Sequence, residues 1–247
     1  MARFYLPPAH WSTPLWELPE DEARHASKVL RMREGDQCIV FDGHGIAAHA
    51  NILSISSATH VTLQPGEFCT PPLHTPTNIT LCQSIPKGGN MDLIIQKSVE
   101  LGVSHIIPLI TERTIVRLTD KEASAKQEKW QRVALEACKQ CGQNTLPLVA
   151  HPIHFTAWLN QGIPSELPLI ASLAPGARPI RHILEEARQA GKKQVALLVG
   201  PEGDFTTDET QRALQAGFIP ITLGDIILRV ETASFFSLSA IRYALDE

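Results

Sequence analysis

The sequence predicts an α/β protein in which a small, mostly β N-terminal domain precedes a larger domain built on a doubly wound sheet. Apolar runs at Val195–Val199 and Ile219–Leu223 are each followed by a glycine-containing loop and a helical pattern, which is the repeat of a parallel α/β sheet. Cys69–Thr77 (CTPPLHTPT) holds three prolines without periodicity, as interdomain linkers do. The expected domains are therefore 1–72 and 73–247.

The N-terminal domain is predicted to contain short strands and one helix. The strands are expected at Cys38–Phe41, Ala48–Ile55 and His60–Leu63, with Asp42-Gly43 as a hairpin turn. Pro19–Met32 is predicted to be a helix, because acidic residues lie near its start and basic residues near its end, as the helix dipole favours. A chain of this size and pattern suits a small barrel.

The second domain is predicted to alternate strands and helices. Strands are expected at Ile79–Ser84, Ile106–Leu109 and Leu167–Ser172, and helices at Met91–Leu101, Asp120–Cys141, Pro179–Ala190 and Ala233–Leu245. The longest helix has an apolar stripe made of Trp130, Val133, Ala134, Ala137 and Cys141. The loops at the carboxyl ends of the strands should form the ligand edge of the sheet.

The loop after Val195–Val199, Gly200-Pro201-Glu202-Gly203-Asp204, is the first candidate site. Thr206 and Glu209 form a Thr-x-x-Glu capping box that opens the next helix. A glycine turn at a helix N-terminus commonly binds phosphate, but the acids here would repel it. A neutral or cationic ligand bound through backbone groups fits better, and an ordinary capped turn is the alternative. A second glycine, Gly224, interrupts the next apolar strand in the same way.

Composition sets wide limits. Of the 247 residues 43% are hydrophobic and 19% charged, as in globular domains, and no apolar run approaches the length of a membrane span. The N-terminal stretch MARFYLPPAHW lacks a secretory core, and five cysteines, an odd number, favour reduced thiols, so a cytoplasmic location is expected. The scattered histidines show no ligand spacing, and no metal is expected. A net charge of −4 argues against a general nucleic-acid binder, so any RNA contact requires a local basic patch.

Two C-terminal motifs, GPEG-x-x-T-x-x-E and LG-x-x-ILR-x-ET, resemble those of the SPOUT class of RNA methyltransferases. Within this class the chain is most similar to the RsmE family, which methylates N3 of a uridine in small-subunit (16S) ribosomal RNA. Further matching segments follow in the expected order, at Arg3-Phe4, Val29–Met32, Phe41–Gly43, Gln96–Val103, Glu112-Arg113 and Glu136–Gly142. The resemblance covers nearly the whole chain.

The resemblance implies a fold that the pattern alone does not. From the pattern, unthreaded loops are expected because knots are nearly absent from proteins. The family instead has a SPOUT-type α/β domain with a C-terminal deep trefoil knot, preceded by a PUA-like β-barrel that helps to seat RNA. It also implies a homodimer whose partner subunit completes the site.

The implied cofactor is S-adenosyl-L-methionine, enclosed by three loops at the ligand edge. The residues expected to bind it are Leu173, Gly200, Pro201, Glu202, Gly203, Leu223, Gly224, Ile227, Leu228 and Thr232. Arg229 and Glu231 are the expected catalytic pair, with Arg229 stabilising charge on the uracil and Glu231 orienting it or accepting the N3 proton. An internal salt bridge between these two residues is the alternative.

The implied RNA contacts are Arg3, Arg31, Lys87 and Arg113, each of which could instead serve an ordinary structural role. The chain departs from the family at Gln143, Asp204 and Asp225-Ile226, where arginine, glycine and Pro-Arg are common. The RNA substrate is expected to be either free or within the assembled 30S subunit, and the sequence leaves this open.

Other functions stay open at this stage. They are methylation of another RNA or base position, a non-catalytic RNA-binding assembly factor, and a nucleotide-binding α/β enzyme. The missing Gly-x-Gly-x-x-Gly and P-loop patterns argue against the last.

Overall fold

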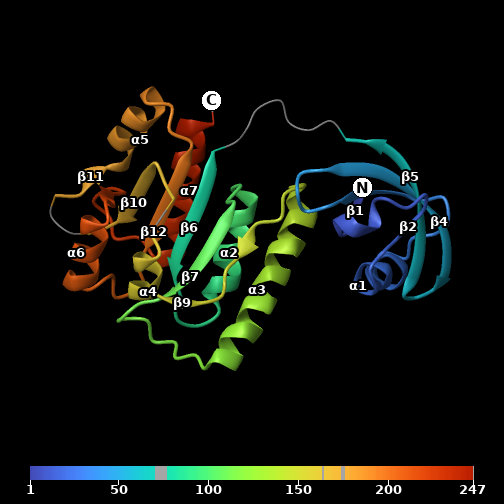
Figure 1. The fold of residues 1–247 in the computed structure, drawn as a ribbon, viewed down its shortest axis with the longest axis horizontal. Helices are drawn as coiled ribbons and strands as arrows, with labels where there is room; N and C mark the ends of the chain where they lie inside the picture. The colour runs from blue at the N-terminus through green and yellow to red at the C-terminus, as the bar shows by residue number, and fades with distance from the viewer. Residues whose placement is uncertain (70–76, 163, 174–175, 247) are drawn as a thin grey trace. The chain divides into compact units, whose positions relative to one another are not determined.

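The computed structural model describes residues 1–69, 77–162, 164–173 and 176–246, which cluster into two compact units. The first unit comprises the described residues up to 69 together with Leu135–Leu146, and the second comprises the rest. Most of the predicted linker, 70–76, lies outside the described residues. Figure 1 shows the chain from the blue N-terminal strands to the red C-terminal helix.

The first unit is built on a five-stranded sheet. Its strands are β1 (Ala2–Tyr5), β2 (Trp16–Glu17), β3 (Gln37–Phe41), β4 (Ala47–Ser57) and β5 (His60–Phe68), in the order β1-β3-β4-β5-β2. β1 pairs parallel with β3, and the other pairs are antiparallel. In the described residues β1 and β2 are the free edges of the sheet, so hydrogen bonds do not close the expected barrel.

The predicted helix at Pro19–Met32 is shorter and changes character. α1 (Glu20–Arg24) passes into a π-helical turn, His25–Val29, in which the Leu30 N–H donates to the His25 carbonyl. Arg31 then adopts φ = 51°, a left-handed conformation that cannot continue a helix. A short 3₁₀ turn, Pro8–His10, follows β1.

A buried ion pair lies between α1 and the segment Leu135–Leu146. Lys139 Nζ lies 3.0 Å from Glu22 Oε1, and both side chains are more than nine-tenths buried. Burial raises the pKa of the Glu22 carboxyl, although the Lys139 charge and hydrogen bond oppose that shift. Removing one partner would leave a desolvated charge without compensation.

We therefore expect Lys139→Met to destabilise the first unit by about 3–5 kcal/mol, the range for a broken buried pair. Hydrogen exchange of peptides from β3 to β5 would measure the change. The double variant Lys139→Met/Glu22→Gln should recover most of the protection. Equal losses in the single and double variants would contradict a role for the uncompensated charge.

The second unit contains an eight-stranded sheet whose strand pairs are all parallel. The strands are β6 (Asn78–Ser84), β7 (His105–Ile110), β8 (Leu148–Val149), β9 (Ile153–His154), β10 (Leu167–Ala171), β11 (Arg178–Pro179), β12 (Gln194–Val199) and β13 (Ile219–Thr222). Their order is β11-β13-β10-β12-β6-β7-β8, and β9 also pairs with β7. The predicted parallel α/β sheet is confirmed.

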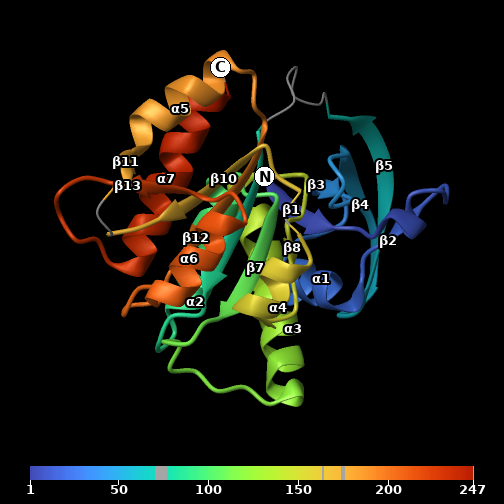
Figure 2. The same ribbon diagram turned by 60° about the vertical axis from the view of Figure 1, so that its left-hand side comes forward.

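Helices cover both faces of this sheet (Figure 2). They are α2 (Asn90–Glu100), α3 (Asp120–Cys141), α4 (Phe155–Asn160), α5 (Ile180–Gln189), α6 (Thr207–Gln215) and α7 (Val230–Leu245). α7 packs against α2 and α5, whereas Phe155 and Trp158 of α4 and Ala213 of α6 pack with Ala196 and Leu198 of β12.

The long helix α3 has the predicted bounds, but one residue of its predicted stripe is wrong. Trp130, Ala134 and Ala137 are buried as expected, whereas Cys141 is exposed and Cys138 is fully buried. Cys138 continues the four-residue spacing of Trp130 and Ala134, so it lies on the same helical face.

A buried polar contact fixes the position of α7 on the sheet. Ser234 Oγ donates to Gln83 Oε1 over 2.6 Å, and Gln83 Nε2 donates to the Ser84 carbonyl. Both side chains are fully buried. Since buried polar groups are costly when unpaired, this contact favours one registration of the helix. It therefore positions the N-terminal turn of α7, which forms part of the candidate site.

Candidate functional site

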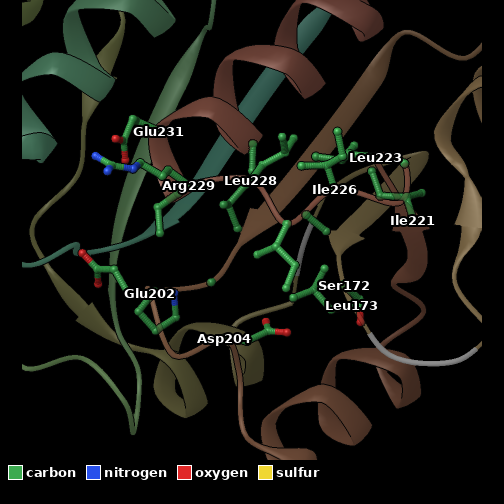
Figure 3. Close-up of a pocket in the computed structure, with 18 of the residues that line it drawn as sticks. Ser172, Leu173, Glu202, Asp204, Ile221, Leu223, Ile226, Leu228, Arg229 and Glu231 are labelled. Carbon is green, nitrogen blue, oxygen red and sulfur yellow. The ribbon is translucent and has the colours of Figure 1, made fainter.

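A cavity of about 520 Å³ lies at the carboxyl edge of the C-terminal sheet. Three loops surround it (Figure 3): one follows β10, one follows β12 and one joins β13 to α7. These loops meet because the carboxyl ends of parallel strands share one edge. The first turn of α7 and part of the loop after β6 complete the lining.

The residues that line the cavity come from every predicted loop. They are Lys87, Asn90, Ala171, Ser172, Leu173, Val199, Gly200, Pro201, Glu202, Asp204, Ile221, Leu223, Gly224, Ile226, Ile227, Leu228, Arg229, Val230, Glu231 and Ala233. Eight of the ten predicted cofactor residues are therefore here, and Gly203 and Thr232 are not. Ala174 and Pro175, in the predicted third loop, lie outside the described residues.

Gly200 is closely packed against the residues that follow it in the loop. A Cβ there would lie 3.1 Å from both Asp204 Oδ1 and the Phe205 ring, closer than ordinary contacts allow. A larger residue at position 200 would therefore require Asp204 or the Phe205 ring to shift by a few tenths of an ångström. These contacts are with the protein itself, so the predicted close approach of the Gly200 backbone to a ligand stays a prediction.

Glu209 joins the loop after β12 to the loop after β7. The predicted capping box is present, with Thr206 Oγ1 accepting from the Glu209 N–H and Glu209 Oε2 accepting from the Thr206 N–H. The other oxygen, Oε1, accepts from the Glu112 N–H over 2.9 Å. Glu209 is buried, so a single desolvated carboxylate holds two loops through backbone donors.

Arg113 and Glu202 add two further ties to the same loop. Arg113 Nη1 donates to the Gly203 carbonyl over 2.5 Å and to the Phe205 carbonyl over 3.4 Å. Glu202 Oε1 accepts from the Lys87 N–H over 3.0 Å. The wall of the cavity is therefore fixed by contacts from the loops after β6 and β7.

Arg229 and Glu231 lie two positions apart at the start of α7, with Val230 between them. Arg229 is its N-cap residue, with φ = −65° and ψ = 155°, and Glu231 stands in the first turn, where the helix dipole favours a carboxylate. Among the described residues neither makes a salt bridge, so the alternative of an internal ion pair is not what the structure shows. Both line the cavity and are labelled in Figure 3.

The predicted RNA contacts have different surroundings. Arg31 and Lys87 are exposed, and Lys87 also borders the cavity. Arg3 is half-buried, donating to Asn144 Oδ1 over 2.5 Å and lying over the Phe41 ring. Arg113 is exposed but binds the loop carbonyls.

Several lining residues were not predicted. Asn90 and Ser172 lie at element ends, where sequence alone does not show which way a side chain points. Ile226 and Ile227 are 78% and 77% exposed at the mouth of the cavity, and only Ile227 was predicted. Asp204 was noted only as a departure from a family pattern.

The described residues hold neither a metal-binding cluster nor a helix that could span a membrane. There, no three His, Cys, Asp or Glu side chains gather in a way that could hold a metal ion. Over the same residues, no helix is long and apolar enough to span a membrane.

Comparison with known proteins gives matches over nearly the whole chain. Residues 73–242 match the RNA methyltransferase domain, and residues 18–65 match the RNA methyltransferase PUA domain. The chain is 31% identical to ribosomal RNA small subunit methyltransferase E of Bacillus subtilis, over 94% of this chain and 91% of that protein. It is 32% identical to the protein of the same name from Buchnera aphidicola, over 90% and 85%.

Solved structures are similar over the same extent. The Neisseria gonorrhoeae ribosomal RNA small subunit methyltransferase E, bound to S-adenosyl methionine, is 36% identical with a TM-score of 0.86, covering 98% of this chain and 97% of that one. A Legionella pneumophila protein in complex with the cofactor SAM is 31% identical with a TM-score of 0.87, covering 99% and 98%.

The ties made by Arg113 generate a prediction that needs no ligand. Arg113→Met should free the Gly203 and Phe205 carbonyls and speed amide exchange in residues 200–206 by about tenfold, as expected for the loss of about 1.4 kcal/mol. Exposed Arg117, on the same segment, gives the matched control Arg117→Met. Unchanged exchange in the Arg113 variant would show that the contact does not hold the loop.

Proposed function

The chain belongs to the ribosomal RNA small subunit methyltransferase E family, and from this premise we propose that it methylates N3 of a uridine. It is an S-adenosylmethionine-dependent methyltransferase of small-subunit ribosomal RNA, with an α/β methyltransferase domain and an N-terminal PUA-like domain. The N3 assignment is carried by Arg229 and Glu231, which both line the cavity and form no salt bridge within the described residues.

The cavity fits the cofactor. Its volume of about 520 Å³ falls within the range of roughly 300–1,000 Å³ usual for small-molecule sites. Glycine-containing loops and apolar side chains form most of the wall, and Glu202 and Asp204 supply negative charge toward a cationic ligand. When bound, S-adenosylmethionine supplies a methyl group already activated by its sulfonium.

The loops would hold the cofactor through the predicted residues. Backbone groups of Gly200, Leu223 and Leu228 would bind the adenosine, and Leu173, Pro201, Glu202, Gly224 and Ile227 would enclose it. Gly203 and Thr232 stay predictions, since neither lines the cavity as described. The contacts of Glu209 and Arg113 would keep these loops in place before binding, which lowers the entropic cost of ordering them when the cofactor binds.

Arg229 and Glu231 would serve the reacting base. N3 of uracil carries a proton, so forming the N3–CH₃ bond and breaking the S–CH₃ bond must be accompanied by its loss. Glu231 would accept that proton, and Arg229 would stabilise the negative charge that develops on the flanking carbonyl oxygens. The reaction would require N3 and the methyl carbon to lie roughly 3–3.5 Å apart, as in other near-attack arrangements.

RNA would be positioned by basic residues. Arg31 and Lys87, both exposed, are proposed to contact phosphates. Arg3 and Arg113 are proposed as contacts as well, alongside the intramolecular bonds each already makes. The target uridine must leave its stack to reach N3, as in other enzymes that modify bases.

The finer features of the assembly are also proposals. We propose a homodimer that acts in the cytoplasm, with the assembled 30S subunit as an alternative to free RNA. A C-terminal trefoil knot is proposed because β13 lies between β10 and β11, two strands joined by one loop.

The N3 assignment is tested by methyl transfer from a labelled donor to small-subunit RNA, followed by mass mapping of the product. We expect one modified nucleoside, 3-methyluridine. Methyl on another base atom would contradict the assignment, while leaving the family membership intact.

The catalytic pair is tested by substitution. Arg229→Met and Glu231→Gln should each lower kcat by about 10²–10³ while the Kd for S-adenosylmethionine changes little, because each acts mainly on charge or proton movement at the base. Arg181→Met, in an exposed position on α5, is the control. An unchanged kcat in either variant would remove that residue from the mechanism.

A further inference from the structure

Asp204 occupies a backbone position that suits glycine better. Its φ of 60° lies in the left-handed region, and among the described residues only Arg31 shares this feature without being glycine. Aspartate tolerates this conformation better than most residues, but glycine adopts it without cost. A carboxylate in this strained position indicates that its side chain has a role of its own.

The Asp204 carboxylate is fixed at the cavity wall. Its Oδ1 accepts from the Phe205 N–H over 2.8 Å, which sets the side-chain direction. Asp204 lines the cavity, and Figure 3 shows it extending from the loop after β12. Its second oxygen, Oδ2, has no hydrogen-bond partner in the described part of the chain.

The charge of Asp204 is not neutralised within the protein. Two basic residues line the same cavity, Lys87 and Arg229, and within the described residues neither forms an ion pair with Asp204. The other acids have different surroundings, since Glu202 accepts a backbone N–H and Glu231 stands at the start of α7. A half-buried carboxylate with one free oxygen is suited to a cationic donor group.

We propose that Asp204 binds the α-ammonium group of the methionine portion of S-adenosylmethionine. This rests on the proposed function, which places that cofactor in the cavity. The cofactor has two cations, and the sulfonium must approach the base held by Arg229 and Glu231. Those residues lie at the α7 side of the cavity, whereas Asp204 comes from the loop after β12, so the ammonium is its partner (Figure 3).

The test compares three ligands by isothermal titration calorimetry. S-adenosylmethionine has both cations, S-adenosylhomocysteine has only the ammonium, and 5′-methylthioadenosine has neither. Asp204→Asn keeps the side-chain shape and an oxygen acceptor. In this variant the affinities for S-adenosylmethionine and S-adenosylhomocysteine should fall by the same factor, about tenfold or more. Binding of 5′-methylthioadenosine should stay within twofold of the wild type.

Two further variants distinguish this binding role from an effect on folding and from the general electrostatic effect of a nearby negative charge. Asp204→Gly relieves the left-handed conformation, so it should fold at least as stably as the wild type and show the same loss of affinity. Asp225→Asn removes an exposed charge from the neighbouring loop and should change none of the three affinities beyond twofold.

Each outcome decides a separate point. A larger loss for S-adenosylmethionine than for S-adenosylhomocysteine would assign Asp204 to the sulfonium and overturn the proposal. Equal affinities in Asp204→Asn and wild type, or an equal loss for all three ligands, would also overturn it. Failure of the wild-type protein to bind any of the three would instead refute the proposed function itself.

Discussion

The site depends on one buried carboxylate whose two oxygens are both occupied by backbone donors. Glu209 caps its own helix through Thr206 and also holds the N–H of Glu112, which lies on another loop. A desolvated carboxylate is costly unless it is paired, so these hydrogen bonds make the positions of the two loops interdependent. The cavity can then stay formed without ligand, because hydrogen bonds outside the cavity hold the loops that line it.

The remaining parts of the site follow from the parallel sheet. Loops at one edge supply backbone to enclose a ligand, and α7 begins at the same edge with Arg229 and Glu231. The buried contact between Ser234 and Gln83 sets the position of α7 on the sheet. The loops thus enclose the ligand, whereas the residues proposed for the chemistry stand at the N-terminus of a helix.

Sequence reasoning predicted well what is encoded locally. The strand and helix order, the capping box at Thr206 and most of the cofactor loops are each visible within a few residues of chain. The resemblance to a family added the cofactor and the catalytic pair, which composition and periodicity could not supply.

What could not be predicted depends on contacts between distant residues. The second bond of Glu209 joins residues 97 positions apart, and Arg113 reaches a carbonyl 90 positions away. The predicted contact of Arg113 with RNA stays a prediction, whereas its bonds to the Gly203 and Phe205 carbonyls had no local signal in the sequence. The early end of the first helix has no local signal either, since Arg31 adopts a conformation usually left to glycine.

The most direct test of this account is a crystal structure of the protein with S-adenosylmethionine. The account predicts adenosine among the backbone groups of Gly200, Leu223 and Leu228, with the methyl carbon facing the space beside Arg229 and Glu231. Cofactor density at another place, or a methyl carbon directed away from these two side chains, would contradict it.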